Sequence, residues 1–475
     1  MKNDYENEEK TQKILLNENE ENIEQMETDK TENNYTKKEK LIYILKGISS
    51  IISSIIQFFT YYSIWTLGYS VIYLVSFRKN YNSNITHSYA YCYISLMNLT
   101  FRLTTPLGGY IEDKMGGKKT IALSNFILCI SFIIIYCSRI IYIDFFLMCL
   151  IGFGIGIGYN VTKKNACSFF MNKKALICAI INFFPNILCF ILIFYYEVFI
   201  LNYNNVYPKI DKIFYEEKIY MNYQIVIIYE INIIIVAGLA TFLLFFKNNP
   251  NETLKFGFNE KIEDNIKQVN NKEIEIEKSK KKITKKIKRQ KALSDNRTIK
   301  LIIIVSLFFP MINLINNDLL MDLHFYFIFG GLYNLVACIS SLIFGLIGDI
   351  VQFRILFTIL SALLACTSFL YTYYFNGEFI LFIITILISL IFNGFNIIFD
   401  SHIMKVYGME NHTEIWGIIR SPEAIIEILG IIFNFTLERN SFMYKIIYGI
   451  TGPLSLVSLG LGLFEYEHKF DYNKN

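Results

Sequence analysis

Apolar residues along this chain fall into long runs separated by short polar stretches. A helix that crosses a bilayer needs about 20 mainly apolar residues, because its backbone polar groups must be satisfied within the helix. The runs predict twelve membrane-spanning helices, six on each side of one long charged segment. They lie at 49–76, 87–108, 120–138, 143–161, 175–199, 223–246, 299–317, 323–347, 355–375, 378–403, 414–437 and 444–464.

Polar segments divide the chain into five parts. Residues 1–47 predict a disordered cytosolic N-terminus, because Glu, Asn, Lys and Thr dominate its composition. The two sets of spans predict six-helix bundles at 48–246 and 299–466. Between them, 247–298 predicts a basic cytosolic linker, either flexible or a short helix on the membrane surface. Residues 467–475 predict a cytosolic tail.

The orientation follows from the basic residues. An even number of spans places both termini on one side, and residues 247–300 carry sixteen Lys and Arg, which predicts that this side is the cytosol. Arg78 and Lys163 lie near the ends of apolar runs and count here as loop residues. The sequon Asn84-Ile85-Thr86 then falls on the opposite side, where it is accessible to glycosylation. The chain is expected in the plasma membrane or an organelle membrane.

Composition excludes several classes of protein. Charged residues make up 18% of the chain and hydrophobic residues 53%, whereas soluble domains carry roughly 25% charged residues. A net charge of +4 gives no reason to expect nucleic acid as a partner. The nine cysteines are scattered singly, without the spacing of a zinc site or a disulfide framework. We therefore expect no cofactor and no metal.

An internal repeat links the two sets of spans. The step along the chain from Gly109 to Gly345 equals the step from Asp113 to Asp349. The segment Gly158-Tyr159-Asn160 has its counterpart, Gly394-Phe395-Asn396, at the same offset. One offset that fits widely separated landmarks predicts two homologous halves. Such repeats are typical of secondary transporters, in which one half rocks against the other around a central site.

The loop after the second span resembles the signature of the major facilitator superfamily. That signature is a glycine followed at fixed spacing by an aspartate, a basic residue, a second glycine and further basic residues. The loop after the eighth span carries a shorter copy, Gly345 and Asp349. The matching residues of the first copy are Gly109, Asp113, Lys114, Gly116 and Lys118.

The resemblance implies an all-helical membrane fold of twelve helices in two pseudo-symmetric bundles. It also implies that the two loops form a gate. Asp113 is expected against the start of the eleventh helix, whose unpaired N–H groups favour an anion. Asp349 is expected against the start of the fifth helix, near Lys173 and Lys174. The alternative is that these loops only assist folding and topology.

Further residues resemble the oxalate/formate antiporter and monocarboxylate transporter branch of the superfamily. They are the glycine-rich stretch from Gly152 to Gly158 and the pair Lys174-Ala175. Members of that branch commonly carry an arginine in the eighth helix, whereas 323–347 contains neither Arg nor Lys. The resemblance implies transport of a small organic anion such as a monocarboxylate, coupled to protons or by exchange.

Ionisable side chains inside predicted spans cost free energy unless they are paired or hydrated, so each is a functional candidate. Arg102 lies in the second span, and Arg420, Glu423 and Glu427 share one face of the eleventh. The fold of the superfamily makes these two helices neighbours. The arginines are therefore expected either to pair with the glutamates in an interdomain gate or to bind an anionic substrate directly.

Two more carboxylates, Glu230 and Asp400, are candidates for proton coupling, and the alternative is that they are solvated or locally paired. The first, fourth, seventh and tenth helices line the cavity in the resembled fold. Polar and aromatic groups on them are expected either to line it or to serve helix packing. They are Tyr61, Trp65, Tyr159, Asn160, Asn313, Asn316, Asn393 and Asn396.

The expected function is secondary active transport of a small organic solute by alternating access, in a monomer embedded in lipid. An amino acid or another small polar metabolite is the alternative substrate. A membrane receptor or scaffold that transports nothing is the alternative of a different class. We do not expect an enzyme, because the sequence brings no nucleophile, base or metal ligands to a common site.

Overall fold

The computed structural model describes residues 37–68, 88–138, 140–201, 217–247, 295–319, 326–374 and 378–436, and single residues at 71, 74, 75, 78, 453, 454, 456, 457 and 460. Contacts divide the chain into one unit at Met1–Ile48, described only as helix from residue 37, and a second at Ser49–Asn475. Every contact discussed below lies within the second unit. The sequon at Asn84, most of the central linker and the C-terminal tail lie outside the described residues.

The described regular elements are all helices. Those that precede the central linker are here called the N-terminal helices: α2 (Lys37–Gly68), α4 (Ser88–Met115), α5 (Gly117–Cys137), α6 (Ile141–Phe169), the short η1 (Met171–Lys173), α7 (Lys174–Leu201) and α8 (Glu217–Leu244). Those that follow it are the C-terminal helices: α11 (Asn296–Leu319), α12 (Tyr326–Gly348), α13 (Phe353–Tyr374), α14 (Glu378–Val406), α15 (His412–Arg420) and α16 (Glu423–Thr436). Eight of the described helices are long and apolar enough to cross a membrane.

Each of the first eleven predicted spans overlaps a described helix, but several helices extend beyond the apolar runs. α6 continues to Phe169, beyond the predicted end at residue 161. The eleventh span is not one helix, because Ser421 and Pro422 form a turn between α15 and α16. Proline has no backbone N–H and interrupts the helical ladder. The twelfth span, 444–464, falls almost entirely outside the described residues.

Alternate glycines of α6 let two neighbouring helices approach it closely. A Cβ atom on Gly152 would lie 2.1 Å from the carbonyl oxygen of Met97 in α4. On Gly154 it would lie 3.1 Å from Leu128 in α5. Gly156 repeats the α4 contact and Gly158 the α5 contact one turn further along. Small residues that admit close helix packing are typical of membrane bundles, and here they hold α4, α5 and α6 together.

The packing repeats with the offset found in the sequence. A Cβ atom on Gly109 of α4 would lie 3.1 Å from the backbone nitrogen of Glu414 in α15. On its repeat partner, Gly345 of α12, the Cβ atom would lie 2.1 Å from the Cβ of Ala179 in α7. Cys178, directly before Ala179, is separated from Glu414 by the same offset. The two halves of the chain therefore pack across each other in equivalent ways.

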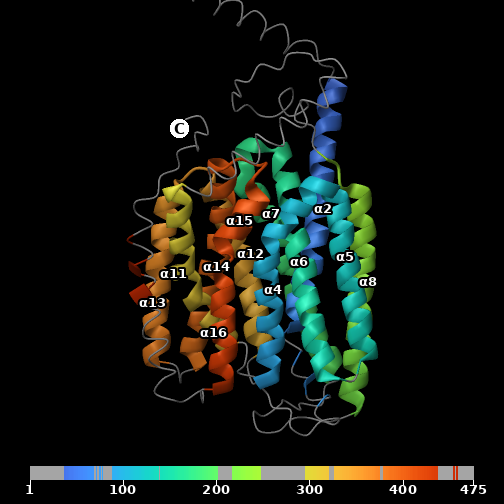
Figure 1. Ribbon diagram of the computed structural model, residues 1–475. Coiled ribbons are helices and arrows are strands. Elements are labelled where there is room, and N and C mark those ends of the chain that lie inside the picture. Colours follow the sequence, from blue (N-terminus) through green and yellow to red (C-terminus); the bar gives the residue numbers. More distant parts are fainter. Residues whose placement is uncertain are drawn as a thin grey trace, which may run out of the picture. The chain divides into compact units, whose positions relative to one another are not determined.

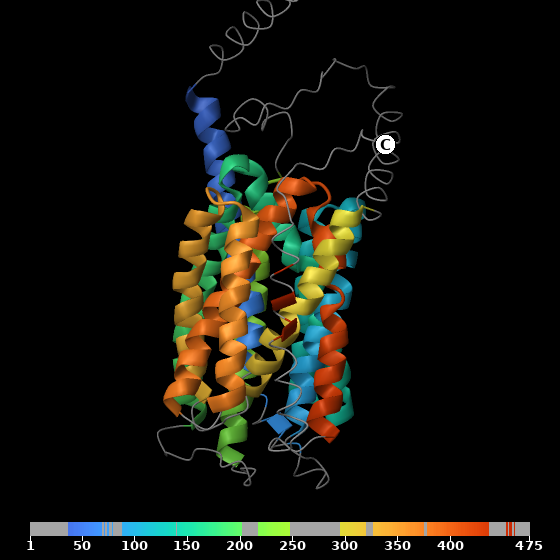
Figure 2. The same ribbon diagram turned by 90° about the vertical axis from the view of Figure 1, so that its left-hand side faces the viewer.

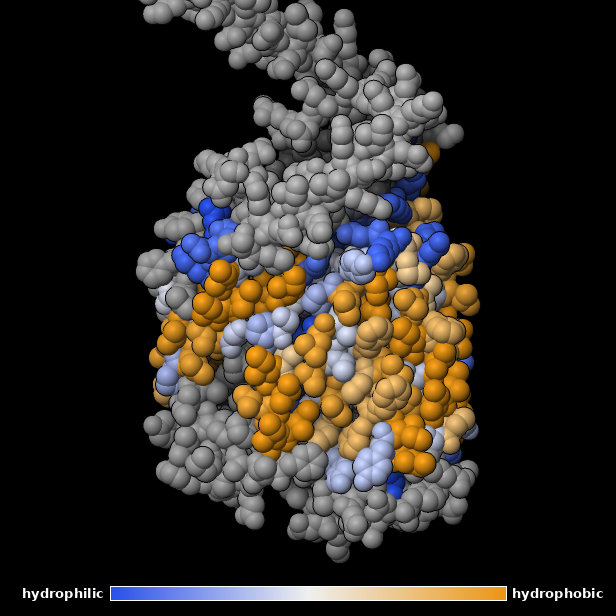
Figure 3. Space-filling view, viewed as in Figure 1, coloured by the Kyte–Doolittle hydropathy of each residue, from blue (hydrophilic) through white to orange (hydrophobic). Residues whose placement is uncertain are grey.

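Figure 1 shows α4, α5, α6 and α8, coloured blue to green, beside α11, α13, α14 and α16, coloured yellow to red. Contacts between the two sets come mainly from α4 with α15 and α16, and from α7 with α12 and α14. Figure 2 shows α4 and α16 side by side. On the face seen in Figure 3, apolar residues cover the middle and hydrophilic ones gather toward one end, as expected for a membrane protein.

Candidate functional site

Two arginines and one glutamate meet in the interior, between the N-terminal and C-terminal helices. Arg102 comes from α4, Arg420 ends α15 and Glu423 begins α16. The Nε atoms of Arg102 and Arg420 lie 3.0 Å and 2.5 Å from the two carboxylate oxygens of Glu423. Arg420 also donates from Nη1 to Oδ1 of Asn396 in α14, at 2.7 Å. We call Arg102, Asn396, Arg420 and Glu423 the central cluster.

The turn between α15 and α16 shapes this cluster. Because Ser421 and Pro422 separate the two helices, Arg420 and Glu423 face each other across the turn, and Arg420 Nη2 donates to Glu423 Oε2 at 3.1 Å. All three charged side chains are at most 9% exposed. Glu427, one turn further along α16, is also buried and acts electrostatically on Arg102. The structure thus brings together the four residues that the sequence analysis grouped.

A second buried ion pair also joins the N-terminal to the C-terminal helices. Lys163 Nζ of α6 lies 2.7 Å from Asp400 Oδ2 of α14, and both side chains are at most 1% exposed. The ammonium also lies over the rings of Phe58 and Tyr159, at 4.7 and 4.8 Å from their centroids. We call Lys163 and Asp400 the latch. Lys163 was expected in a loop, which is wrong because α6 runs beyond the apolar run.

Trp416 of α15 lies between the latch and the central cluster. Its indole N–H donates to Oδ1 of Asp400. Its ring faces the guanidinium of Arg420, with Cζ at 4.6 Å from the ring centroid, and packs at 5.7 Å from the ring of Tyr159. Trp416 was not predicted as a site residue from the sequence. A tryptophan one helical turn before an intramembrane arginine was the available signal.

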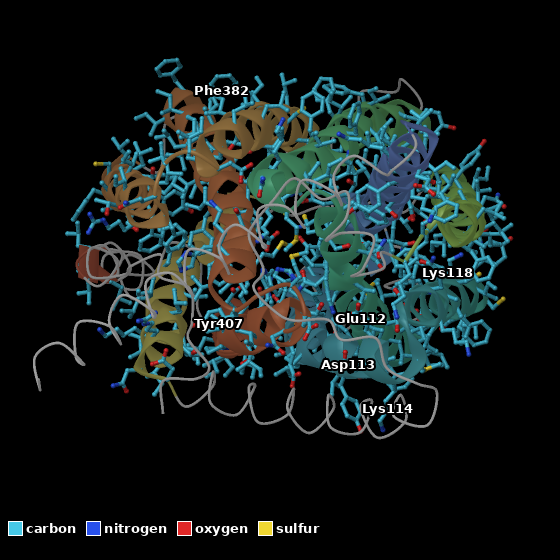
Figure 4. The ribbon with its side chains drawn as sticks, turned by 90° about the horizontal axis from the view of Figure 1, so that it is seen from above. Glu112, Asp113, Lys114, Lys118, Phe382 and Tyr407 are labelled. Atoms are coloured by element: carbon cyan, nitrogen blue, oxygen red, sulfur yellow. The ribbon has the colours of Figure 1, made fainter. Side chains whose placement is uncertain are left out.

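The two signature loops lie at the end of the helices that we call the motif end, defined by Gly109–Lys118 and Gly345–Asp349. Figure 4 shows Glu112, Asp113 and Lys114 there together. Glu112 Oε2 accepts from Lys164 Nζ at 3.0 Å and from Thr413 Oγ1, near the start of α15, at 3.4 Å. Asp113, expected at the start of α15, is exposed. Glu112, the preceding residue, contacts the start of that helix through Thr413.

The remaining signature residues shape this end of the protein. Gly116 has a φ of 81°, a backbone conformation that glycine adopts at little cost, and this lets α4 turn into α5. Lys114 Nζ lies 4.3 Å from the ring centroid of Tyr110, and Lys118 Nζ lies 5.3 Å from that of Phe242.

The side chain of Asp349, which follows α12, lies against the start of α7. Its two carboxylate oxygens accept from the backbone N–H groups of Ala175 and Leu176, at 3.0 and 3.1 Å. This is the contact that the sequence analysis expected for Asp349. Unpaired N–H groups and the aligned peptide dipoles make the first turn of a helix a favourable position for a carboxylate.

His412 begins α15 at the motif end, outside the predicted spans. It is fully buried, and neither ring nitrogen meets a hydrogen-bond partner among the described residues. Burial lowers its pKa from 6.5 to about 3; Lys164, Lys163 and Lys174 lower it further, while Asp400 opposes the shift. His412 is therefore neutral at physiological pH.

The expected cavity residues of the N-terminal helices gather around Tyr159. Rings from α2, α4 and α15 surround it, and the ring of Trp65 lies 6.0 Å away. Tyr61 also lies beside Tyr159, with 6.3 Å between the ring centroids, and its hydrogen bond to Ser124 at 3.1 Å serves helix packing. Asn160 is fully buried, yet among the described residues no partner meets either end of its amide. Its repeat partner, Asn396, binds Arg420.

The other expected site residues are more dispersed. Asn393 donates to the backbone oxygen of Ser389 in its own helix, at 3.0 Å. Glu230 is buried in α8 and accepts from Ser63 Oγ of α2 at 2.9 Å, away from the central cluster. The side chains of Asn313 and Asn316 lie outside the described residues, although α11 includes both positions.

A third buried ion pair, which was also not predicted from the sequence, lies within the part of the chain before the central linker. Arg78, counted as a loop residue, lies with its Nε 2.6 Å from Asp144 Oδ2, and both side chains are at most 1% exposed. It also donates to the carbonyl oxygen of Ser138 at 2.6 Å. Because these partners flank the junction of α5 and α6, Arg78 fixes the end of the bundle opposite the motif end.

A small cavity of about 20 Å³ lies within the N-terminal helices. Apolar side chains of α4, α5, α6 and α8, such as Met97, Phe132 and Ile227, line it together with residues of the first span. A cavity of this size holds about one water molecule. It contains none of the charged residues described above and is too small for an organic solute.

Comparison of the sequence with protein-family models and with curated proteins gives no match. Solved structures do resemble it. The human organic anion transporter MFSD10 (TETRAN) superposes with a TM-score of 0.59 at 10% identity, covering 88% of this chain and 99% of that one. The proton:xylose symporter XylE, bound to 6-bromo-6-deoxy-D-glucose, superposes with a TM-score of 0.61 at 10% identity, covering 90% and 95%.

The two solved structures bear on the fold of this chain, since each is 10% identical to it. Both are transporters of the major facilitator superfamily, and the likeness extends over nearly the whole of each chain. An integral, multi-pass membrane protein with the major facilitator fold is therefore the conclusion that sequence and structure share.

Proposed function

We propose that this protein is a secondary transporter that moves a small organic anion by alternating access. One observation carries the proposal: the two ion pairs Arg102–Glu423 and Lys163–Asp400 join the N-terminal to the C-terminal helices deep in the interior. Buried charges cost free energy unless they are paired or hydrated, and inside a membrane they commonly mark a functional site. When the two halves rock, ion pairs that join them are broken and others form in their place.

The central cluster also supports the substrate class. Two guanidinium groups share the single carboxylate of Glu423, so a substrate carboxylate that replaces Glu423 at one of them forms the same charge-assisted hydrogen bonds. The human neighbour carries organic anions. The resemblance to the oxalate/formate and monocarboxylate branch narrows the proposal to monocarboxylates.

A proton accompanies or exchanges with the anion in this proposal. With Glu427 included, two arginines and two glutamates make the cluster neutral. A bound monoanion then leaves one uncompensated negative charge in the interior, at a cost of several kcal/mol. Protonation of one carboxylate removes that cost. Asp400 and Glu230 remain candidate proton carriers, the first because it loses its partner when the latch opens.

The motif end is the cytosolic gate in this proposal. Asp349 holds the start of α7, and Glu112 bridges Lys164 and Thr413. Asp113 remains a proposed gate residue from its place in the signature. In this proposal the contacts of Asp349 and Glu112 hold the motif end closed.

Uptake into proteoliposomes tests the proposed function. Labelled monocarboxylates, dicarboxylates and neutral and acidic amino acids are offered with and without an inward proton gradient. We expect saturable monocarboxylate uptake that the gradient accelerates and that Arg420→Ala abolishes. Arg354→Ala, on a partly buried arginine at the start of α13, is the matched control and keeps the uptake.

An amino acid is the second candidate substrate, because the cluster offers carboxylates as well as guanidiniums to a zwitterion. Uptake of amino acids without monocarboxylates replaces the anion proposal by this one. If no solute in the panel is carried, the receptor or scaffold interpretation gains support.

A further inference from the structure

We infer that Trp416 is a positioning residue that couples the central cluster to the latch, so that displacement of Arg420 by a solute releases Lys163 from Asp400. This inference rests on the proposed function for the role of the solute. Its structural part, the connection between two ion pairs, stands on contacts within the protein.

Trp416 touches both charged groups through different parts of one rigid ring system. The indole N–H donates to Asp400, while the ring face lies against Arg420 at 4.6 Å. The side chain is 1% exposed and is the largest of the fully buried side chains. A close-packed interior transmits displacements rather than absorbing them. The indole therefore cannot keep its hydrogen bond to Asp400 if the guanidinium moves.

The latch carboxylate and the central cluster lie one turn apart along two helices, α14 and α15. In α15, Trp416 precedes Arg420 by four residues; in α14, Asn396 precedes Asp400 by four. Trp416 contacts Asp400, and Arg420 contacts Asn396. Residues four apart lie one turn apart on the same face of a helix. The same two helices thus hold the latch carboxylate and the central cluster in adjacent turns, with Trp416 connecting them.

The latch lies where the two halves meet symmetrically. The separation of Lys163 and Asp400 along the chain exceeds the repeat offset by a single position, so α6 and α14 contribute nearly equivalent positions. Tyr159 extends the connection on the α6 side, because its ring lies under the Lys163 ammonium and beside the Trp416 ring. A pair at this position parts as soon as the two halves rotate.

The consequence is an order of events. A substrate carboxylate competes with Glu423 for Arg420, and the guanidinium leaves the Trp416 ring. Trp416 then ceases to hold Asp400, and the latch parts. Because Asp349 and Glu112 hold the motif end nearby, loosening the latch favours the opening of that end. Trp416 positions Asp400 in this account and touches no solute.

Hydrogen–deuterium exchange in lipid nanodiscs tests the connection on the whole protein. Trp416→Phe keeps an aromatic ring against Arg420 but has no N–H for Asp400. We expect the amides of Ala175 and Leu176, which bind Asp349, to exchange about tenfold faster, as for loss of a hydrogen bond to a charged group. Lys163→Met should produce the same pattern, and the double variant should add little. Peptides around Ser138, which Arg78 holds, serve as the internal control and stay unchanged.

A purely structural role for Trp416 gives a different pattern. It predicts faster exchange throughout both bundles, including the Ser138 region, and this outcome overturns the inference. Wild-type exchange at the motif end in Trp416→Phe overturns it too. If Trp416→Phe aggregates, Trp416→Tyr provides the same test, because its hydroxyl cannot replace the indole N–H at the same position.

The solute arm separates this inference from the proposed function. A transported carboxylate should accelerate exchange at Ala175 and Leu176 in the wild type and have no further effect in Trp416→Phe. Uptake by the wild type together with an unaltered solute response in the variant contradicts only the coupling role. If the wild type carries no solute but the variants still loosen the motif end, the proposed function fails and the structural connection stands.

Discussion

At the residue scale, Glu423 is the charge on which the central cluster depends. It is fully buried and is shared by Arg102 and Arg420. Removing one member of a buried ion pair leaves its partner uncompensated, which costs far more than the pair itself contributes.

Glu423→Gln is therefore expected to lower the free energy of unfolding by about 3–5 kcal/mol, the usual cost of breaking a buried pair. It should also abolish uptake. Thermal inactivation in detergent and proteoliposome flux measure the two effects. Glu112→Gln is the control for stability alone, since its pair with Lys164 is partly exposed and such pairs contribute at most about 1 kcal/mol. Equal melting of Glu423→Gln and the wild type contradicts this account of the cluster.

His412 gives the protein a pH dependence of defined sign. Burial holds its pKa near 3, whereas the unfolded chain titrates at about 6.5. Below pH 6.5 the unfolded state therefore binds more protons than the folded state, and stability falls as the pH decreases toward 3. We expect the wild type to lose more thermal stability than His412→Gln between about pH 7.5 and about pH 5. Identical pH profiles for the two proteins argue against a buried, neutral His412.

Residue-scale predictions from sequence succeeded where the charge lay in mid-span and failed near span ends. Arg102, Arg420, Glu423 and Glu427 were grouped because they lie inside predicted spans that are neighbours in the resembled fold. Lys163 and Arg78 were missed because a charge at the end of an apolar run looks like a loop residue. A long helix buries such a charge when another element supplies the counter-ion, and Asp400 and Asp144 do so from outside the local sequence.

At the element scale, the apolar runs predicted the order and approximate position of the helices, because backbone desolvation in lipid allows little else. They did not predict helix ends, since helices extend into water as soon as polar side chains replace apolar ones. The break between α15 and α16 had a local signal in Pro422, but proline inside a membrane helix also produces kinks without breaks. Pro106 and Pro185 lie inside continuous helices.

The contact between α12 and α7 depends on the absence of a side chain at Gly345. A Cβ atom there would lie 2.1 Å from that of Ala179, so Gly345→Ala should cost about 1–3 kcal/mol, as overpacking does. The double variant Gly345→Ala/Ala179→Gly moves the methyl group to the other helix and should regain most of that loss. Melting temperatures of the wild type, the single variant and the double variant measure this loss and its recovery. Failure of the second substitution to rescue the first contradicts the packing described here.

At the scale of the whole molecule, the internal repeat relates contacts as well as sequence. Gly109 with Glu414 and Gly345 with Ala179 are nearly equivalent, and Lys163 and Asp400 lie close to the symmetry relation. The charges of the central cluster are not repeated in the other half. The position equivalent to Arg420 is Phe184, and the position equivalent to Arg102 is Cys338. A symmetric scaffold with an asymmetric charge cluster suits a carrier that must bind one solute in two alternating states.

Distances across both ends of the protein report whether the two halves alternate. Spin labels introduced as unnatural amino acids avoid the nine native cysteines. Lys119 and Glu410 are exposed at the motif end, and Tyr142 and Phe379 at the opposite end. In nanodiscs, a transported solute should lengthen the distance between Lys119 and Glu410 while it shortens that between Tyr142 and Phe379. Distances that stay fixed, or that change in the same direction at both ends while uptake continues, contradict alternating access.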